Sequence, residues 1–276
     1  MGGGEAGRDV TACLVRRLLA AQFPQWAELP IAPMLSAGTD NALYRLGEAM
    51  VVRLPAAAWA AGQAAREWRF LPGLAAHLPL AVPIPLGLGV PGEGFAAAWS
   101  VCRWVPGRDA QVAPPEDMMA AAQALAGFVR ALRAIDATGG PTPGAANSGR
   151  GVALTARDAA VRRALRECAG LVDTVAVGRA WQRALAARAW EGTPVWLHGD
   201  LHRGNLVVRD GVLAGVIDFG CMAVGDPACD LMPGWSMFAP AARTAFRDGC
   251  GADDAMWARA MGWALSVAVI ALASTQ

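Results

Sequence analysis

The sequence contains no lysine, so all 24 of its basic side chains are arginines, and these nearly balance its 23 acidic ones. The formal net charge of +1 gives no electrostatic case for a nucleic-acid or membrane-surface partner. Only three histidines are present, and none of the six cysteines forms a C-x-x-C pair. A structural zinc site and a disulfide scaffold are therefore not expected, and the pattern predicts reduced thiols in a cytoplasmic protein.

Long apolar segments are scarce as well. The N-terminal residues lack the basic segment and the apolar stretch of a signal peptide. The longest apolar run, residues 260–273, is too short to span a bilayer and is predicted to form a buried C-terminal helix. The 276-residue chain is 55% hydrophobic with much alanine, which is typical of a helix-rich globular protein with one large or two modest domains.

The hydrophobic pattern changes near residues 104–107, where a Pro-Gly pair interrupts it. Before this point the sequence predicts helices over 9–23 and 56–76, strands over 31–35, 41–46, 50–54 and 95–104, and an edge strand within the Pro/Gly-rich segment 78–94. After it, the sequence predicts helices over 114–137, 155–169 and 173–190, a loop over 139–151 with a composition typical of disorder, and a helical C-terminus. We therefore predict an α+β fold of two lobes, residues 1–104 and 105–276.

The most informative segment is His-Gly-Asp-Leu-His-Arg-Gly-Asn over residues 198–205, followed by Ile-Asp-Phe-Gly over 217–220. Between them, two β-rich runs flank an Asp-Gly pair at 210–211, which is a strong hairpin signal. A hairpin folds back on itself, so Asn205 at its start and Asp218 at its end are predicted to lie close together. Asp200 lies just upstream of the same hairpin.

These residue types suit phosphoryl transfer. An amide and a carboxylate at one end of a hairpin are ligands that Mg²⁺ accepts while phosphate oxygens and water complete its coordination. Asn205 and Asp218 are therefore candidate metal ligands, and Asp200 is a candidate general base for an attacking hydroxyl. His198 is expected only to shape the loop through backbone hydrogen bonds, and His202 is not expected to take part in the chemistry.

Other features have a structural interpretation. The segment 87–92 fits G-x-G-x-x-G, but prolines precede and interrupt it and no helix follows, so a dinucleotide site is not expected. Asp226 and Asp230 are expected to cap turns rather than to bind an amine. The C-terminal aromatic and methionine residues are expected to be mostly core, with an apolar wall for a bound acceptor as the alternative: Trp235, Met237, Phe238, Met256, Trp257, Met261 and Trp263.

The order of these motifs resembles the aminoglycoside phosphotransferase family, whose members are kinase-like enzymes that act on small molecules. The resemblance rests on the 198–205 and 217–220 segments and on Gly-Asp-Pro-Ala-Cys-Asp-Leu over 225–231. Gly199 stands where protein kinases usually carry arginine. The resemblance implies a protein-kinase-like fold, with an antiparallel sheet in a small N-terminal lobe and a larger, mostly helical C-terminal lobe. It also leads us to expect a tail beyond residue 276.

The resemblance further assigns a nucleotide site to the N-terminal lobe. Arg53 occupies the third-strand position where kinases carry lysine, and it is expected to contact the phosphates and pair with Glu67. Arginine carries a planar guanidinium, whereas lysine carries a compact point charge, so this replacement is not neutral for phosphate binding. Further nucleotide-binding residues are implied in the phosphate-covering turn of residues 36–41 and in the hinge of residues 101–103: Ser36, Gly38, Val101 and Arg103.

The predicted function is transfer of the γ-phosphate of Mg²⁺-bound ATP or GTP to a hydroxyl of a small molecule, with an antibiotic as the leading acceptor. The segment from 191 to the end holds nine acidic residues and five arginines, which suits a polycationic aminoglycoside. Residues 105–190 hold seven acidic residues and eleven arginines, and this basic segment suits an aminoglycoside poorly. The other interpretation is that these arginines form a solvated helical face. The alternatives are a macrolide kinase, a choline- or sugar-type metabolite kinase, and a nucleotide-binding pseudokinase or regulatory scaffold.

Overall fold

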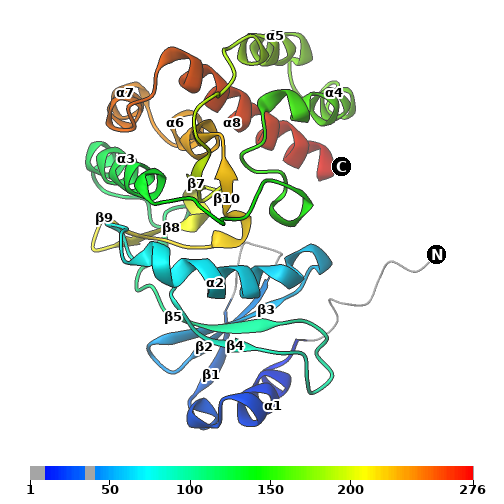
Figure 1. Ribbon diagram of the computed structural model, residues 1–276, viewed down its shortest axis with the longest axis vertical. Coiled ribbons are helices and arrows are strands. Elements are labelled where there is room, and N and C mark those ends of the chain that lie inside the picture. Colours follow the sequence, from blue (N-terminus) through cyan, green and yellow to red (C-terminus); the bar gives the residue numbers. More distant parts are fainter. Residues whose placement is uncertain (1–9, 35–40, 276) are drawn as a thin grey trace, which may run out of the picture.

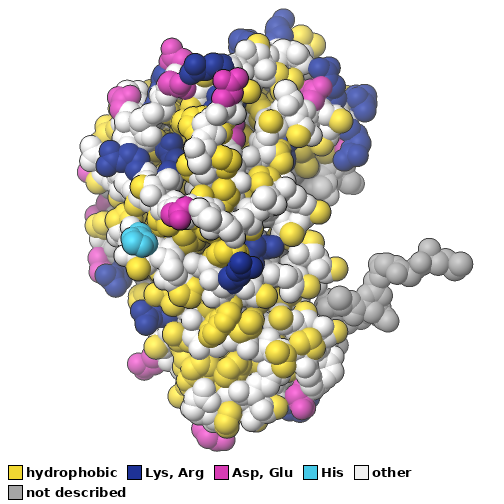
Figure 2. All heavy atoms as spheres, in the orientation of Figure 1, with side chains coloured by type: hydrophobic (Ala, Val, Ile, Leu, Met, Phe, Trp, Pro, Cys, Tyr) yellow, Lys and Arg dark blue, Asp and Glu magenta, His cyan; other side chains and the backbone are white. Residues whose placement is uncertain are grey.

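The computed structural model describes residues 10–34 and 41–275 and has two parts (Figure 1). A five-stranded sheet with one helix on its outer face forms the lower part, and helices dominate the upper part. This arrangement confirms the predicted α+β, kinase-like fold with an antiparallel N-terminal sheet. The outline of the molecule is notched between the two parts on the right-hand side of the space-filling view (Figure 2).

The N-terminal sheet is antiparallel throughout, in the order β1-β2-β3-β5-β4. Its strands are β1 (Ile31–Met34), β2 (Asn41–Leu46), β3 (Met50–Pro55), β4 (Pro85–Gly89) and β5 (Trp99–Arg103). Helix α1 (Ala12–Gln22) starts where the Thr11 hydroxyl accepts a hydrogen bond from the Leu14 N–H, which satisfies an otherwise unpaired helix donor. Its buried stripe, Val15, Leu18 and Leu19, packs against apolar side chains of the sheet and forms the small core.

Helix α2 (Gln63–Ala75) lies between the sheet and the helical part (Figure 1). Its apolar residues Leu71 and Leu74 belong to the core of the C-terminal part, although α2 itself precedes β4 and β5 in the chain. Glu67 is buried on the same helix, one turn before Leu71. This placement lets one helix contact both halves of the molecule.

The C-terminal part is built mainly of helices. They are α3 (Met118–Ala134), α4 (Asp158–Glu167), α5 (Thr174–Leu185), α6 (Pro233–Ser236), α7 (Pro240–Gly249) and α8 (Asp254–Ser274). Aspartates begin three of them, because the side chains of Asp117, Asp173 and Asp253 accept hydrogen bonds from free backbone N–H groups of the first turn. Arginines gather over α4 and α5 in Figure 2, and Arg163 and Arg166 are exposed, so much of the basic charge of this segment is a solvated helical face.

Helix α8 contains the apolar run that the sequence predicts to be helical. By length and composition alone it could cross a membrane, and it is the single helix of the described residues for which this holds. It packs against α4 and α5, and it carries Arg259, whose side chain is 4% exposed and pairs with Asp226. Because α8 contributes one partner of a buried ion pair, it is a core helix of this structure.

Two small ladders hold the polar motifs. Strand β7 (Val195–Leu197) pairs with β10 (Ala223–Gly225), and β8 (Leu206–Arg209) forms a hairpin with β9 (Val212–Val216) that is extended by β6 (Arg108–Asp109). The hairpin turn has positive φ at both Asp210 and Gly211, as a two-residue type I′ turn requires. The predicted hairpin is therefore confirmed, with its turn at the predicted residues.

Several details differ from the sequence predictions. Strand β5 begins only at Trp99, and the helix expected over 56–76 starts with a 3-10 turn over Ala58–Gly62. The loop over 139–151, whose composition is typical of disorder, is held in place: Asn147 is buried, and its amide donates to the carbonyls of Thr142 and Met222. The G-x-G-x-x-G match at 87–92 runs from the sheet edge into a turn, and no helix follows it, as predicted.

Candidate active site

The hairpin brings the two predicted metal ligands together. The N–H of Ile217 donates to the carbonyl of Asn205 at 2.9 Å, which places Asp218 directly after the residue paired with Asn205. The strands β7 and β10 flank the same region, so the 198–205 and 217–220 segments are fixed side by side. Asp218 itself has φ +65°, an unusual conformation for a residue with a side chain. Such a backbone is retained when the surrounding structure determines it, and it occurs often at functional sites.

Buried polar groups shape the loop that carries Asp200. Asp230 is fully buried and accepts hydrogen bonds from the N–H groups of His198 and Gly199, both at 2.7 Å. The His198 ring accepts from the Asp200 N–H through Nδ1 and donates to the Ile217 carbonyl through Nε2. Burial lowers the pKa of His198, which agrees with the neutral ring that this pattern of one donor and one acceptor requires. The structural roles predicted for His198 and Asp230 are confirmed.

Three side chains surround the Asp200 carboxylate. Arg150 Nη2 lies 2.8 Å from Oδ1, whereas Asn205 Nδ2 and His202 Nε2 lie 3.4 Å and 3.5 Å from Oδ2. Burial by itself would raise the pKa of Asp200, but the hydrogen bond from His202 and the charge of Arg150 outweigh it and lower that pKa. Asp200 is therefore an anion with its second oxygen toward the hairpin. The contacts of Arg150 and His202 were not predicted from the sequence.

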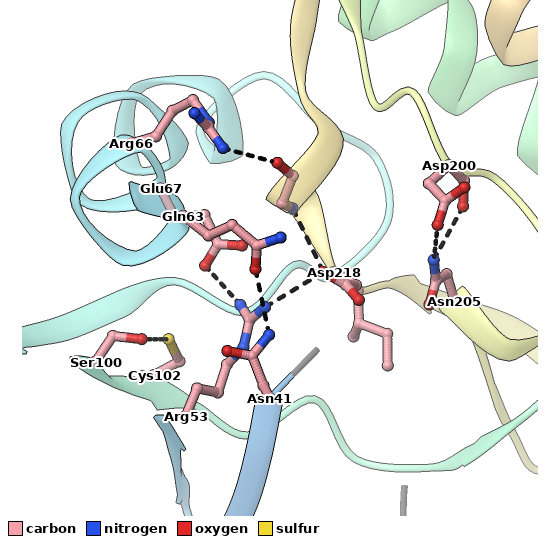
Figure 3. Close-up of polar contacts among 12 residues, drawn as sticks. Asn41, Arg53, Gln63, Arg66, Glu67, Ser100, Cys102, Asp200, Asn205 and Asp218 are labelled. Carbon is pink, nitrogen blue, oxygen red and sulfur yellow. Dashed lines mark hydrogen bonds and ion pairs between the residues drawn. The ribbon is translucent and has the colours of Figure 1, made fainter. Parts of the chain in front are cut away.

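Arg53, Glu67 and Asp218 form a chain of charges across the two parts of the molecule (Figure 3). Arg53 Nη1 lies 2.5 Å from Glu67 Oε2, and its Nη2 lies 3.3 Å from Asp218 Oδ1. Burial would lower the pKa of Arg53, but the charges of Glu67 and Asp218 raise it, so the guanidinium stays charged. The predicted pairing of Arg53 with Glu67 is present, and Arg53 also contacts Asp218.

The donor atoms at the hairpin fit a magnesium ion. Asn205 uses its amide nitrogen on the Asp200 carbonyl at 2.9 Å, which leaves its amide oxygen for a cation. Asp218 offers a carboxylate whose side chain is 37% exposed, so it is accessible to a cation that accompanies a nucleotide. Two hard oxygen ligands are the protein contribution that Mg²⁺ commonly uses beside nucleotide phosphates. No group of three or more His, Cys, Asp or Glu side chains that could hold a metal occurs in residues 10–34 and 41–275.

Helix α2 fastens the Asp218 segment through further contacts. Arg66 donates to the carbonyls of Gly220 at 3.1 Å and Ala146 at 2.8 Å. Gln63 accepts from the amide of Asn41 at 3.2 Å and lies so close to Gly220 that a Cβ there would be 2.5 Å from its amide nitrogen. These side chains bind the start of β2, the 217–220 segment and the 139–151 loop to one helix.

The other predicted nucleotide contacts lie in different settings. Val101 is buried in the middle of β5, between β3 and β4, whereas Arg103 is exposed at the last position of that strand. Its position at the end of the strand makes Arg103 the more accessible of the two hinge candidates. Ser36 and Gly38 lie outside the described residues.

The glycine at 199 is required by its surroundings. It has φ +84°, and a Cβ there would lie 2.4 Å from the Cys221 carbonyl oxygen and 3.0 Å from Arg150 Cβ. We expect Gly199→Ala to lower the free energy of unfolding by more than the roughly 1–3 kcal/mol that an unfavourable backbone conformation costs alone. Urea denaturation followed by circular dichroism measures this loss.

Gly170→Ala is the matched control for this substitution. Gly170 has nearly the same φ, +85°, but no atom lies within 4 Å of a Cβ built there. Gly170→Ala therefore reports the backbone cost, and the difference between the two variants reports the steric conflict at residue 199. Equal losses in both variants would show that the close approach of Cys221 and Arg150 is unimportant.

Comparison with known proteins agrees with this geometry. The structure is similar to the GDP complex of aminoglycoside 2′-phosphotransferase-IIIa, with 20% identity and a TM-score of 0.72 over 94% of this chain and 89% of that one. It is also similar to macrolide 2′-phosphotransferase MphH from Brachybacterium faecium, with 26% identity and a TM-score of 0.64 over 95% and 91%. A third similar structure is the streptomycin–ATP ternary complex of APH(2″)-IIa, with 18% identity and a TM-score of 0.61 over 91% and 85%. Among curated proteins, no sequence matches the chain.

The sequence model of one family covers most of the chain. It is the model named APH, described as the phosphotransferase enzyme family, and it matches residues 33–263. This range contains the whole hairpin, both aspartates beside it and the Arg53–Glu67 pair. The chain therefore belongs to the phosphotransferase enzyme family.

Proposed function

We propose that the protein transfers the γ-phosphate of a Mg²⁺-bound nucleotide to a hydroxyl of an antibiotic in the cytoplasm. The observation that carries the proposal is the convergence of Asp200, Asn205 and Asp218 at one end of a hairpin, with Arg53 in contact with Asp218. In this arrangement Asp200 accepts the hydroxyl proton, and Asn205 and Asp218 are the residues that would hold the ion. The ion, when bound, would neutralise charge on the phosphates.

Arg53 supports an active enzyme over a pseudokinase. In the kinase pattern the third-strand cation pairs with a helix carboxylate, and Arg53 makes this pair with Glu67. Arg53 also contacts Asp218, which places its guanidinium beside the proposed metal ligand. We propose that its guanidinium also binds the phosphates, because its planar fork matches phosphate oxygens. ATP and GTP both remain candidate donors.

The charges near Asp200 favour a weakly basic acceptor such as a macrolide over a polycationic aminoglycoside. The side chains on the Asp200 carboxylate are Arg150, His202 and Asn205, none of which is acidic. Asp226 and Asp230, which could have bound amines, are buried: Asp226 pairs with Arg259, and Asp230 accepts two backbone hydrogen bonds. Among the three relatives compared above, the macrolide enzyme MphH also has the highest identity, 26%.

An acceptor screen tests the proposal. Release of ADP or GDP is measured with the magnesium salt of ATP or GTP and, in separate reactions, erythromycin, kanamycin, streptomycin, choline or glucose. We expect turnover with an antibiotic, faster with erythromycin than with kanamycin, and a product mass increased by one phosphoryl group. Faster turnover with kanamycin would reverse the acceptor preference. Nucleotide binding without turnover of any acceptor would favour the scaffold alternative.

A further inference from the structure

Arg150 reaches the site from a segment that carries no recognised motif. It lies in the loop over 139–151, between α3 and α4, and is separated from Asp200 by 50 residues. Its side chain is only 11% exposed, although it bears a charge. Burying a guanidinium is costly unless it has a charged partner, and the partner here is Asp200 Oδ1 at 2.8 Å.

The space for this side chain exists because residue 199 has no Cβ. An added Cβ at Gly199 would approach Arg150 Cβ and Cγ to 3.0 Å and 3.1 Å, so the stem of Arg150 lies across the glycine. Protein kinases usually carry an arginine at the position of Gly199. In this chain an arginine from a distant loop fills the neighbouring space instead.

The loop that carries Arg150 is fastened on both sides. Arg66 of α2 donates to the Ala146 carbonyl, and Asn147 donates to the Met222 carbonyl. The Asp226 N–H donates to the Gly151 carbonyl at 2.9 Å, directly after Arg150. Hydrogen bonds on both sides of Arg150 fix its backbone. Its buried guanidinium has one hydrogen-bond partner among the described residues, Asp200, because Nε and Nη1 make no hydrogen bond there.

We propose that Arg150 is a positioning residue for Asp200: it holds Oδ1 so that Oδ2 is presented to the acceptor hydroxyl. The proposal rests on the proposed function, because it assumes that Asp200 takes the acceptor proton. It assigns separate tasks to the two oxygens of one carboxylate. Oδ1 is bound by Arg150, whereas Oδ2 has only the longer contacts with Asn205 and His202.

Arg150→Met tests the proposal, because methionine keeps an unbranched stem across Gly199 but removes the guanidinium. With the antibiotic that gives turnover in the acceptor screen, we expect kcat to fall by about 10²-fold, the order of loss that misplacement of a reacting group causes. The KM for nucleotide should be unchanged, since Arg150 contacts neither Arg53 nor Asp218 in the structure. Arg150→Lys should recover part of kcat, because the lysine ammonium restores the positive charge but not the planar guanidinium.

A double-mutant cycle separates positioning from general structural support. If Arg150 acts through Asp200, adding Arg150→Met to Asp200→Asn should lower kcat no further, because residues that act as a unit are not additive. Arg163→Gln is the control: it removes the same charge from α4, at a side chain that is 69% exposed, and should leave kcat unchanged. Circular dichroism and the thermal midpoint of every variant are compared with those of the parent protein.

The outcomes distinguish this inference from the proposed function. Wild-type kcat in Arg150→Met, or a full additional loss in the double variant, would overturn the positioning role alone. Equal turnover by the parent protein and Asp200→Asn would overturn the proposed role of Asp200, and this inference with it. Absence of turnover by the parent protein with every acceptor screened would overturn both.

Discussion

Asp200→Asn is expected to lower kcat by about 10²–10⁴-fold, which is the usual contribution of a general base. Asparagine keeps the shape of the side chain and can still bond to its neighbours, but it does not accept the proton of the hydroxyl. Nucleotide affinity should change little, because Asp200 does not contact Arg53 or Glu67. Steady-state kinetics with the accepted antibiotic and calorimetric titration of the nucleotide measure the two effects separately.

Asp210→Asn is the matched control for this substitution. Asp210 stands in the turn of the β8–β9 hairpin, its side chain is 94% exposed, and asparagine tolerates its positive φ. The same change of carboxylate to amide, made in this exposed turn instead of beside the proposed site, should leave kcat unchanged. A kcat of Asp200→Asn close to that of Asp210→Asn would remove Asp200 from the chemistry.

Asp218→Asn is expected to lower kcat by at least about 10²-fold, because metal stabilisation of the transferred charge is worth several kcal/mol. The variant loses the proposed anionic ligand for Mg²⁺ and the charge that Arg53 contacts at 3.3 Å. The Mg²⁺ concentration for half-maximal turnover should therefore rise. A magnesium titration at fixed nucleotide concentration measures this shift.

The magnesium titration also separates the roles of the two aspartates. Asp200→Asn should reduce turnover at every Mg²⁺ concentration without moving the midpoint, since Asp200 is not proposed as a ligand. Asp218→Asn should recover part of its turnover at high Mg²⁺. If both variants shift the midpoint equally, the division between base and ligand is wrong.

The part of the site that sequence predicts well is the part made by neighbours in the chain. The Asp-Gly turn fixes the hairpin, the hairpin pairs Asn205 with Ile217, and Asp218 follows directly. The Arg53–Glu67 contact was predicted through the kinase-like order of strand and helix, and the structure contains it. Asp226 and Asp230 were expected to cap turns rather than to bind an amine; Asp226 accepts from the Ala228 N–H as such a cap does, and both residues are buried.

The part that sequence did not predict depends on contacts between distant segments. Arg150 lies in a loop whose composition is typical of disorder, and nothing near it in the chain indicates Asp200 as its partner. The one available signal was Gly199, where the absence of a side chain leaves space for another. The assignment of Val101 to the hinge stays a prediction; the structure shows that its side chain is buried and that its strand lies between two others.

Helix α2 gives the two aspartates a common mechanical support. Glu67 reaches Asp218 through Arg53, and its neighbour Arg66 binds both Gly220 and the loop that carries Arg150 toward Asp200. A displacement of this one helix would therefore disturb the surroundings of both proposed catalytic carboxylates at once. We expect substitutions that loosen α2 to affect the proposed roles of Asp200 and Asp218 together rather than one at a time.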